Sequence, residues 1–277
     1  MDTDITKTFP KFKRPLTKKA KWYLEQHSSV NDAFNFARFE DRATLNSLYD
    51  AGVNINCDID APNKLNMFNW SITAHGACNP YFLELMFKYG RKDIETDGQK
   101  VFEMACAYGD TRHIEIFMSR QKEYEWDLYE CMKSAVMRGN VSNLHHLLLY
   151  KQPTKEEKCE LWDYECGNFS ANTKMLLYMY QFWGCDTITK EKLTEIIPRH
   201  FCDVLIFFVR LYLEKNEPFT ITTDIVQNIL GSTDDRMIKL QYLIEKGFEV
   251  EQYDNIKNTP EEELPKPSKR RYYSYAY

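Results

Sequence analysis

The sequence predicts an all-α chain folded as a solenoid of about seven helix-turn-helix units. An apolar pattern recurs about every 30 residues along most of the chain. Within each copy, the apolar residues follow the i, i+3, i+4 spacing of a helix that faces a core. Gly and Pro number only 10 each, too few for a turn-rich β protein. One helix pair cannot bury its apolar face alone, whereas stacked pairs share a continuous core.

The stretch MACAYGDTRHIEIFM, residues 104–118, sets the register of the repeat. Similar patterns lie 30 and 61 residues towards the C-terminus and 31 residues towards the N-terminus of this stretch. Two more copies lie outside these four, one on each side. The sequence around residue 206 is long enough for one more, degenerate copy. The first apolar residue of the second helix recurs at Leu45, Leu83, Ile114, Leu144, Met175 and Leu240.

Each copy has the same predicted anatomy. A short first helix carries a small residue, Ala105 in the reference copy, which lets a neighbour approach closely. A Gly-Asp or Asn-containing turn follows, where Asp110 is placed to cap the second helix. A polar connection then leads to the next copy, and the four clearest connections read NCDIDAPNKLN, RKDIETDGQK, QKEYEWD and KQPTKEEK.

Two copies end in a glycine followed by a small or polar segment, YDAGVNIN (49–56) and IEKGFEVE (244–251). With ACAYGDTRHIEIFM, they resemble the ankyrin repeat over roughly residues 30–252. The resemblance implies ankyrin-like repeats that bind a partner protein through a concave face and the inter-repeat connections, acting as an adaptor or inhibitor. The family's Thr-Pro-Leu-His opening is absent, so the helix caps must differ, and another helix-pair solenoid is the alternative. Degenerate, aromatic-rich arrays are similar to those of large DNA viruses, which implies a viral protein acting on its host.

The pattern divides the chain into three parts. Residues 1–28 form a basic arm with a capping helix near its end, where Trp22 and Tyr23 would cover the first open core. Residues 29–252 form the array, and 186–220 is either a degenerate repeat or a helical insertion. Residues 253–277 are rich in Pro, Glu and Lys and are expected to be a disordered tail.

Composition indicates a reduced, intracellular environment. The eight cysteines include no C-x-x-C pair, and the N-terminus has no apolar signal core. The longest apolar run, VLIFFV at 204–209, is far too short to cross a membrane. We therefore expect free thiols, no membrane partner and a cytoplasmic or nuclear location.

Motifs for catalysis or cofactor binding are missing from the sequence. There is no phosphate-binding glycine loop and no nucleophile elbow. His145 and His146 are adjacent, so on a helix they point some 100° apart and cannot share one metal. Cys159 and Cys166 are seven residues apart but lack a second ligand pair. We expect no enzyme activity, cofactor, metal or small-molecule substrate.

The connection EYEWDLY, residues 123–129, is the most distinctive candidate for partner binding. Trp126 lies among acidic residues, where it is either a binding anchor or a residue that packs, with Tyr129, on the neighbouring hairpin. Acidic residues on other connections would favour a partner with a basic surface. The alternative is a nucleic-acid-associated protein using the basic arm, which the net charge of −5 does not by itself predict. The candidate partner-binding residues are Asp58, Asp60, Asp97, Glu123, Glu125, Trp126, Asp127 and Tyr129.

Overall fold

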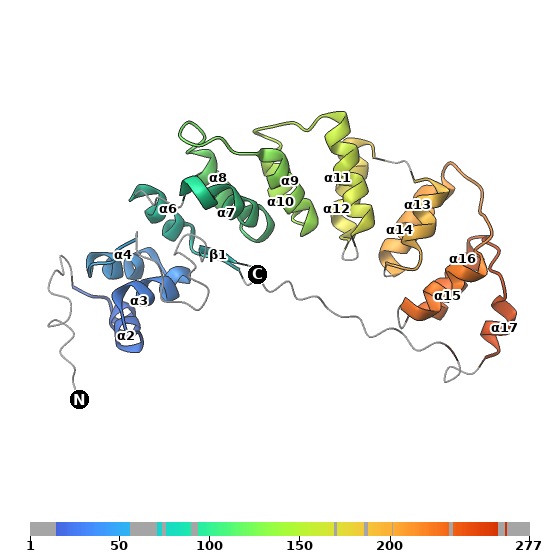
Figure 1. The fold of residues 1–277 in the computed structure, drawn as a ribbon, viewed down its shortest axis with the longest axis horizontal. Coiled ribbons are helices and arrows are strands. Elements are labelled where there is room, and N and C mark those ends of the chain that lie inside the picture. Colours follow the sequence, from blue (N-terminus) through green and yellow to red (C-terminus); the bar gives the residue numbers. More distant parts are fainter. Residues whose placement is uncertain are drawn as a thin grey trace. The chain divides into compact units, whose positions relative to one another are not determined.

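The computed structural model describes residues 15–55, 71–73, 76–89, 94–168, 171–185, 188–200, 202–232, 235–259 and 264. These residues are mostly helical, so the predicted all-α class is confirmed (Figure 1). Contacts divide the chain into two compact units, Met1–Glu157 and Lys158–Tyr277.

The first unit is built of short helices and one small antiparallel hairpin among its described residues. In order, these elements are α2 (Lys18–Gln26), α3 (Val30–Phe36), the 3-10 helix η1 (Ala37–Phe39), α4 (Arg42–Asp50), β1 (Ile72–Thr73), β2 (Gly76–Ala77), α6 (Pro80–Lys88), α7 (Ile94–Tyr108), α8 (Thr111–Met118), α9 (Leu128–Met137) and α10 (Val141–Leu147). Helix α11 (Lys155–Gly167) spans the boundary to the second unit.

The turns before the second helices supply their N-caps. The side chains of Asn79, Asp110 and Asn140 accept hydrogen bonds from backbone N–H groups in the first turns of α6, α8 and α10. Such caps satisfy donors that have no partner within the helix. Asp110 also forms a capping box with His113. The predicted capping role of these turns is confirmed.

Successive helix pairs of the first unit pack on one another. Helix α8 contacts both α6 and α10, and α7 packs along α9. Leu83, Ile114 and Leu144, the predicted first apolar residues of these second helices, are fully buried. The recurring positions therefore form a shared core, as the repeat predicts.

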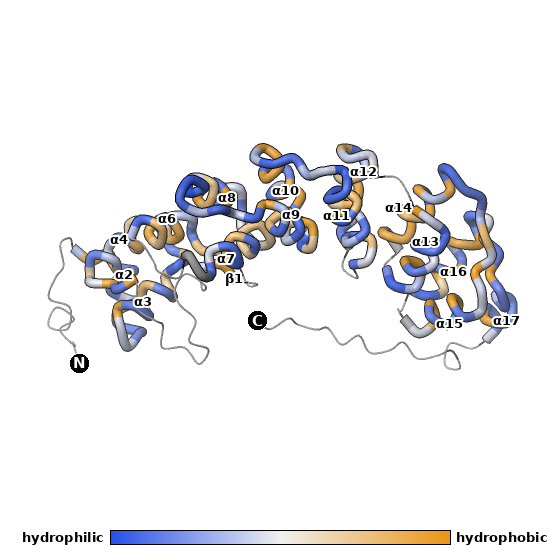
Figure 2. Tube along the Cα trace, turned by 45° about the horizontal axis from the view of Figure 1, so that its top comes forward, coloured by the Kyte–Doolittle hydropathy of each residue, from blue (hydrophilic) through white to orange (hydrophobic). Residues whose placement is uncertain are grey.

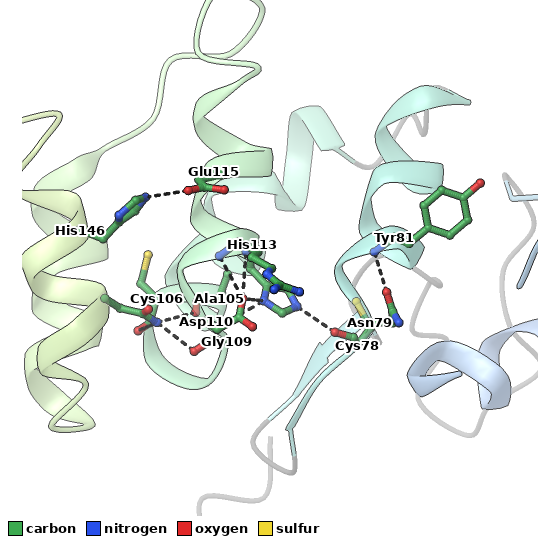
Figure 3. A network of polar contacts seen from close by, with 12 residues as sticks. Cys78, Asn79, Tyr81, Ala105, Cys106, Gly109, Asp110, His113, Glu115 and His146 are labelled. Carbon is green, nitrogen blue, oxygen red and sulfur yellow. Dashed lines mark hydrogen bonds and ion pairs between the residues drawn. The ribbon is translucent and has the colours of Figure 1, made fainter. Parts of the chain in front are cut away.

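At two junctions a buried polar side chain also joins a helix pair to the preceding one (Figure 3). His113 Nε2 lies 2.8 Å from the carbonyl oxygen of Cys78, in the turn before α6. One repeat later, Asn143 Nδ2 donates to the carbonyl oxygens of Cys106 and Gly109, each at 3.0 Å. His113 and Asn143 both lie three residues after an N-cap. This repeated contact holds neighbouring pairs in register.

The second unit continues the alternation of helix pairs. Second helices contact each other from α12 to α14 and from α14 to α16, and α13 and α15 pack on α14 and α16. The predicted first apolar residues Met175 and Leu240 are fully buried. Its elements after α11 are α12 (Thr173–Trp183), α13 (Lys190–Ile196), α14 (Cys202–Leu213), α15 (Thr223–Ser232), α16 (Arg236–Glu245) and α17 (Tyr253–Lys257).

The degenerate stretch 186–220 contains a helix pair, α13 and α14. Leu205 and Phe208 of α14 are buried, and Trp162 of α11 packs edge-on against Phe208 with ring centroids 6.2 Å apart. The stretch therefore has the same two-helix form as the other copies, although its sequence matches them poorly.

Two predictions about local structure were wrong in the first unit. The stretch expected to form the first helix of the second copy instead contains the β1–β2 hairpin, with Ile72 opposite Ala77. Gly76 has φ +140°, a conformation open mainly to glycine. The stretch read as the connection RKDIETDGQK is helical from Ile94 onward, and Ile94 is buried. Asp97 therefore lies on α7 and not on a connection.

Helix α12 is capped by Asn172, whose side chain accepts from Lys174 N and Met175 N, so an amide in the preceding turn caps this second helix as predicted. One further prediction was wrong in the second unit. The predicted disordered tail from residue 253 begins with helix α17, whose Ile256 is buried. Apolar burial extends beyond the last repeat because this helix packs back on the unit.

Candidate partner-binding surface

The connection between α8 and α9, residues 119–127, carries most of the candidate residues. It is hydrophilic along nearly its whole length (Figure 2). Backbone N–H groups of Glu123 and Tyr124 both donate to the carbonyl oxygen of Arg120, at 2.8 and 3.0 Å. These bonds fold the segment into a defined turn.

Trp126 anchors this connection from the inside. Its Nε1 donates to the carbonyl oxygen of Phe117 at 3.0 Å. Its ring meets the rings of Phe102 and Phe117 edge-on at 5.6 and 5.5 Å and stacks on Tyr124 at 5.3 Å. Only part of the side chain remains accessible. Of the two roles left open by the sequence, these contacts match packing on the helix pair.

A glycine in α7 makes room for the Trp126 ring. A Cβ atom on Gly98 would lie 3.1 and 3.2 Å from two ring carbons of Trp126, which is closer than ordinary van der Waals contact. Gly98 lies in the stretch predicted to be the polar connection RKDIETDGQK, yet it is a helical residue whose missing side chain lets the indole approach.

Gln99, which the sequence did not single out, clamps the end of the connection. Its Oε1 accepts from Asp127 N at 2.9 Å, and its Nε2 donates to Asp127 O at 3.1 Å. Asp127 also caps α9, since its carboxylate accepts from Tyr129 N and Glu130 N. An Asp before an apolar helix is a recognisable cap signal, whereas nothing in the sequence marks Gln99 as its partner.

The acidic side chains of the connection differ in how far their carboxylates are already engaged in contacts within the chain. Glu123 pairs with Arg120 at 2.9 Å on the surface, a contact that contributes little to stability. The Asp127 carboxylate is exposed but occupied as a helix cap. Glu125 is exposed and makes no polar contact within the described part of the chain. Glu125 is thus the carboxylate most available to a partner.

The other candidate residues lie near this connection or outside the described ranges. Tyr129 is half-buried in the first turn of α9, and Lys151 Nζ lies 6.0 Å from its ring centroid. Asp97 is partly buried on α7, the same helix as Gln99. Asp58 and Asp60 fall outside the described residues.

Trp22 is more exposed than the sequence predicted. Helix α2 forms as expected, but Ala20 and Leu24 are the residues it buries. Trp22 retains 54% of its surface, so it does not cover the first open core. Tyr23 lies partly buried and donates its hydroxyl to Glu40 Oε1 at 3.1 Å. Ala20 and Leu24 make the cap, and the indole remains on the surface.

Reactive groups are either buried or dispersed in the described part of the chain. Burial raises the pKa of the Cys78 thiol to about 12 and that of Cys106 well above its ordinary value. Such thiols stay protonated and are poor nucleophiles at neutral pH. His146 Nε2 lies 3.7 Å from Glu115 Oε1 (Figure 3), and His145 is exposed. No three His, Cys, Asp or Glu side chains gather to hold a metal among the described residues.

Helices that could cross a membrane are also missing from the described ranges. Comparison with known proteins identified no relative: no protein-family model, curated protein or solved structure matches this chain. The ankyrin resemblance therefore remains an interpretation of the sequence repeat, and the function must be argued from the surface itself.

Proposed function

We propose that this chain is a non-catalytic protein-binding module and that the 119–127 connection contacts a basic surface of its partner. The observation that carries the proposal is the fixed display of exposed carboxylates on this connection. Because its resemblance is to viral arrays, the expected partner is a host protein, with the chain acting as an adaptor or inhibitor.

Preorganisation supports the proposal. The connection is held by the indole of Trp126, by the Gln99 clamp and by the turn at Arg120. A segment already fixed in its free state loses little conformational entropy on binding, so more of the contact energy remains as affinity. The packing of Trp126 therefore contributes indirectly, because it positions the neighbouring carboxylates.

Charge supports a basic partner. Residues 119–130 contain four carboxylates, Glu123, Glu125, Asp127 and Glu130, and two basic side chains, Arg120 and Lys122. Glu130 lies on α9, where it pairs with Lys133, so the connection itself carries an excess of one negative charge. Its exposed carboxylates would steer a basic surface and disfavour an acidic one. Such steering weakens as salt screens the charges.

Charge reversal on the connection tests the proposal. Full-length protein would capture binding proteins from nuclease-treated lysate, and each captured protein would be purified and its affinity measured directly. We expect the double variant Glu123→Lys/Glu125→Lys to lose at least one specific partner. Neither residue is buried, so the variant should keep the wild-type melting temperature.

The matched control is Glu195→Lys/Glu217→Lys, which makes the same change in net charge at two exposed sites in the second unit. Loss of affinity in the connection variant but not in this control supports the proposal. Equal affinity of the two variants for every purified partner would contradict it.

A further inference from the structure

An aromatic cluster lies on the surface formed by α2 and α3. Trp22 and Phe36 each expose 54% of their surface. They are linked through two other rings: Trp22 meets Tyr23 edge-on at 4.9 Å, Tyr23 stacks with His27 at 6.2 Å, and His27 stacks on Phe36 at 4.4 Å. We call these four residues the α2–α3 aromatic cluster.

The aromatic cluster rests on helix α2, which is packed against its neighbours. Ala20 and Leu24 are buried between α2 and its neighbours, and α2 contacts both α3 and α4. Thr17 caps α2 through its hydroxyl, while its backbone N–H donates to Ser47 Oγ at 3.1 Å. The exposed rings are therefore held in place by the helix beneath them, with their orientations restrained by each other.

Basic side chains flank the cluster. Lys18 precedes Trp22 by four residues and thus lies on the same side of α2. Lys18 and Lys21 are exposed and make no ion pair within the described residues, whereas Lys19 is paired with Glu40. The sequence from Lys7 to Lys21 contains seven basic residues and no acidic residue. The charge leading into the cluster is therefore strongly positive.

The nearby carboxylates reduce this charge only in part. Glu40 is occupied by Lys19 and by the hydroxyl of Tyr23. Asp32 accepts from the hydroxyls of Ser28 and Ser29, at 3.2 and 2.7 Å. Glu25 is the remaining carboxylate on α2, and it is exposed.

We propose that the α2–α3 aromatic cluster, with Lys18 and Lys21, binds single-stranded nucleic acid. Exposed aromatic rings offer stacking platforms for bases of any sequence, and adjacent lysines pair with the phosphates. An acidic peptide would use the lysines but gains little from the ring faces, so the combination favours a strand with bases. This surface is on different elements from the 119–127 connection, so the two proposals stand or fall separately.

Fluorescence anisotropy with full-length protein tests this binding. The probe is a fluorescein-labelled oligodeoxythymidylate, and the competitors are unlabelled duplex DNA and polyglutamate of matched charge. We expect Trp22→Ala to weaken binding on the order of tenfold, and Trp22→Phe to restore most of the affinity. Lys18→Ala and Lys21→Ala should each lower the slope of log affinity against log salt by about 0.7.

The matched controls are Phe182→Ala and Lys174→Ala, which remove an exposed ring and an exposed lysine from α12 in the second unit. Neither control should change the affinity. The proposal is overturned by failure of the oligonucleotide to bind at low salt, or by unchanged binding of Trp22→Ala with a wild-type melting curve. If polyglutamate competes as effectively as unlabelled single-stranded DNA, the surface binds an acidic protein instead, and the proposal is wrong. If duplex DNA competes as effectively as single-stranded DNA, the surface binds phosphates without stacking on bases, which also contradicts the proposal.

Discussion

At the residue scale, the side chain of Trp126 shows how one aromatic ring organises an exposed turn. It contacts two core phenylalanines, stacks on Tyr124 and donates one hydrogen bond to the backbone of α8. Its neighbour Gly98 has no side chain that could exclude the ring. The residue thus links the core of the first unit to the surface proposed to bind a partner.

Replacing Trp126 with Ala should destabilise the first unit by roughly 2–4 kcal/mol, the cost expected for truncating a large, well-packed aromatic side chain. Chemical unfolding followed by circular dichroism measures this change. A partner would bind the variant more weakly as well, because the carboxylates would lose their fixed positions. A melting temperature equal to that of the wild type would contradict the packing role.

Glu165 of α11 is a fully buried carboxyl group in the second unit. It accepts from Asn172 N at 2.6 Å and so ties α11 to the cap of α12. Burial raises the pKa of Glu165 from its ordinary 4.5 to about 7, against the opposing effect of the hydrogen bonds from Asn172 and Asn168. Between these two pH values the folded chain retains a proton that the unfolded chain has released. Stability therefore falls as pH rises through this range and levels off above it.

Glu165→Gln should remove this pH dependence, which amounts to roughly 3 kcal/mol across the range. The Gln side chain keeps an oxygen that accepts from Asn172 N and carries no charge at any pH. Urea unfolding at pH 5 and pH 8 would compare the two proteins. We expect the variant to be the more stable one at pH 8, and an unchanged pH slope would show that Glu165 is not desolvated as described.

Residue roles were predictable from sequence only where they depend on local chemistry. The Gly109-Asp110 turn marked Asp110 as a cap, because capping requires only a short acceptor before a helix. The roles of the tryptophans could not be assigned in this way. Trp126 packs inward because Gly98 lies opposite it, and Trp22 stays exposed because Ala20 and Leu24 already fill the interface of α2. Both facts depend on which residues meet in space.

At the element scale, the helix pairs of the first unit are joined by apolar contacts and, at two junctions, by a buried polar residue. His113 joins α8 to the turn before α6, and Asn143 joins α10 to the end of α7. Buried hydrogen bonds of this kind favour one register over its alternatives, because a shifted register would leave carbonyl groups without donors. The second helices were predicted correctly because their apolar residues are regularly spaced. The same spacing gives each of them a continuous apolar face that packs on its neighbours.

First helices were harder to predict, because their ends depend on contacts outside the repeat. The β1–β2 hairpin occupies residues 72–77, where a helix was predicted, and α7 already includes Ile94, whose side chain is buried. A periodic pattern identifies the buried face of a helix, but it does not identify the residues at which the helix begins and ends.

Asn143→Ala should destabilise the first unit by about 1–2 kcal/mol, since it removes the buried donor shared by the carbonyl groups of Ala105, Cys106 and Gly109. Ser142→Ala on the same helix is the control, because its side chain is exposed and its loss should cost less than about 0.5 kcal/mol. Thermal unfolding of both variants provides the comparison. Equal stability of the two would argue against a structural role for the Asn143 contact.

At the scale of the whole molecule, the sequence pattern correctly predicted a mostly helical chain with recurring buried positions. It did not predict the partner, because binding depends on which exposed residues are fixed and which charges remain unpaired. Two surfaces of the first unit carry opposite character: the acidic 119–127 connection and the basic, aromatic surface of α2 and α3. Each is supported from beneath: Ala20 is buried under the α2 surface, and Gln99 hydrogen-bonds the end of the connection.

The proposed function depends on a fixed conformation of the 119–127 connection, which amide hydrogen exchange measured by NMR would detect. The amides of Tyr124 and Asp127 donate to Arg120 O and Gln99 Oε1, so they should exchange at least about tenfold more slowly than an unstructured chain. In Gln99→Ala, protection of the Asp127 amide should be lost while that of α8 remains. Exchange of the Tyr124 and Asp127 amides in the wild type at the rate of an unstructured chain would contradict the claim.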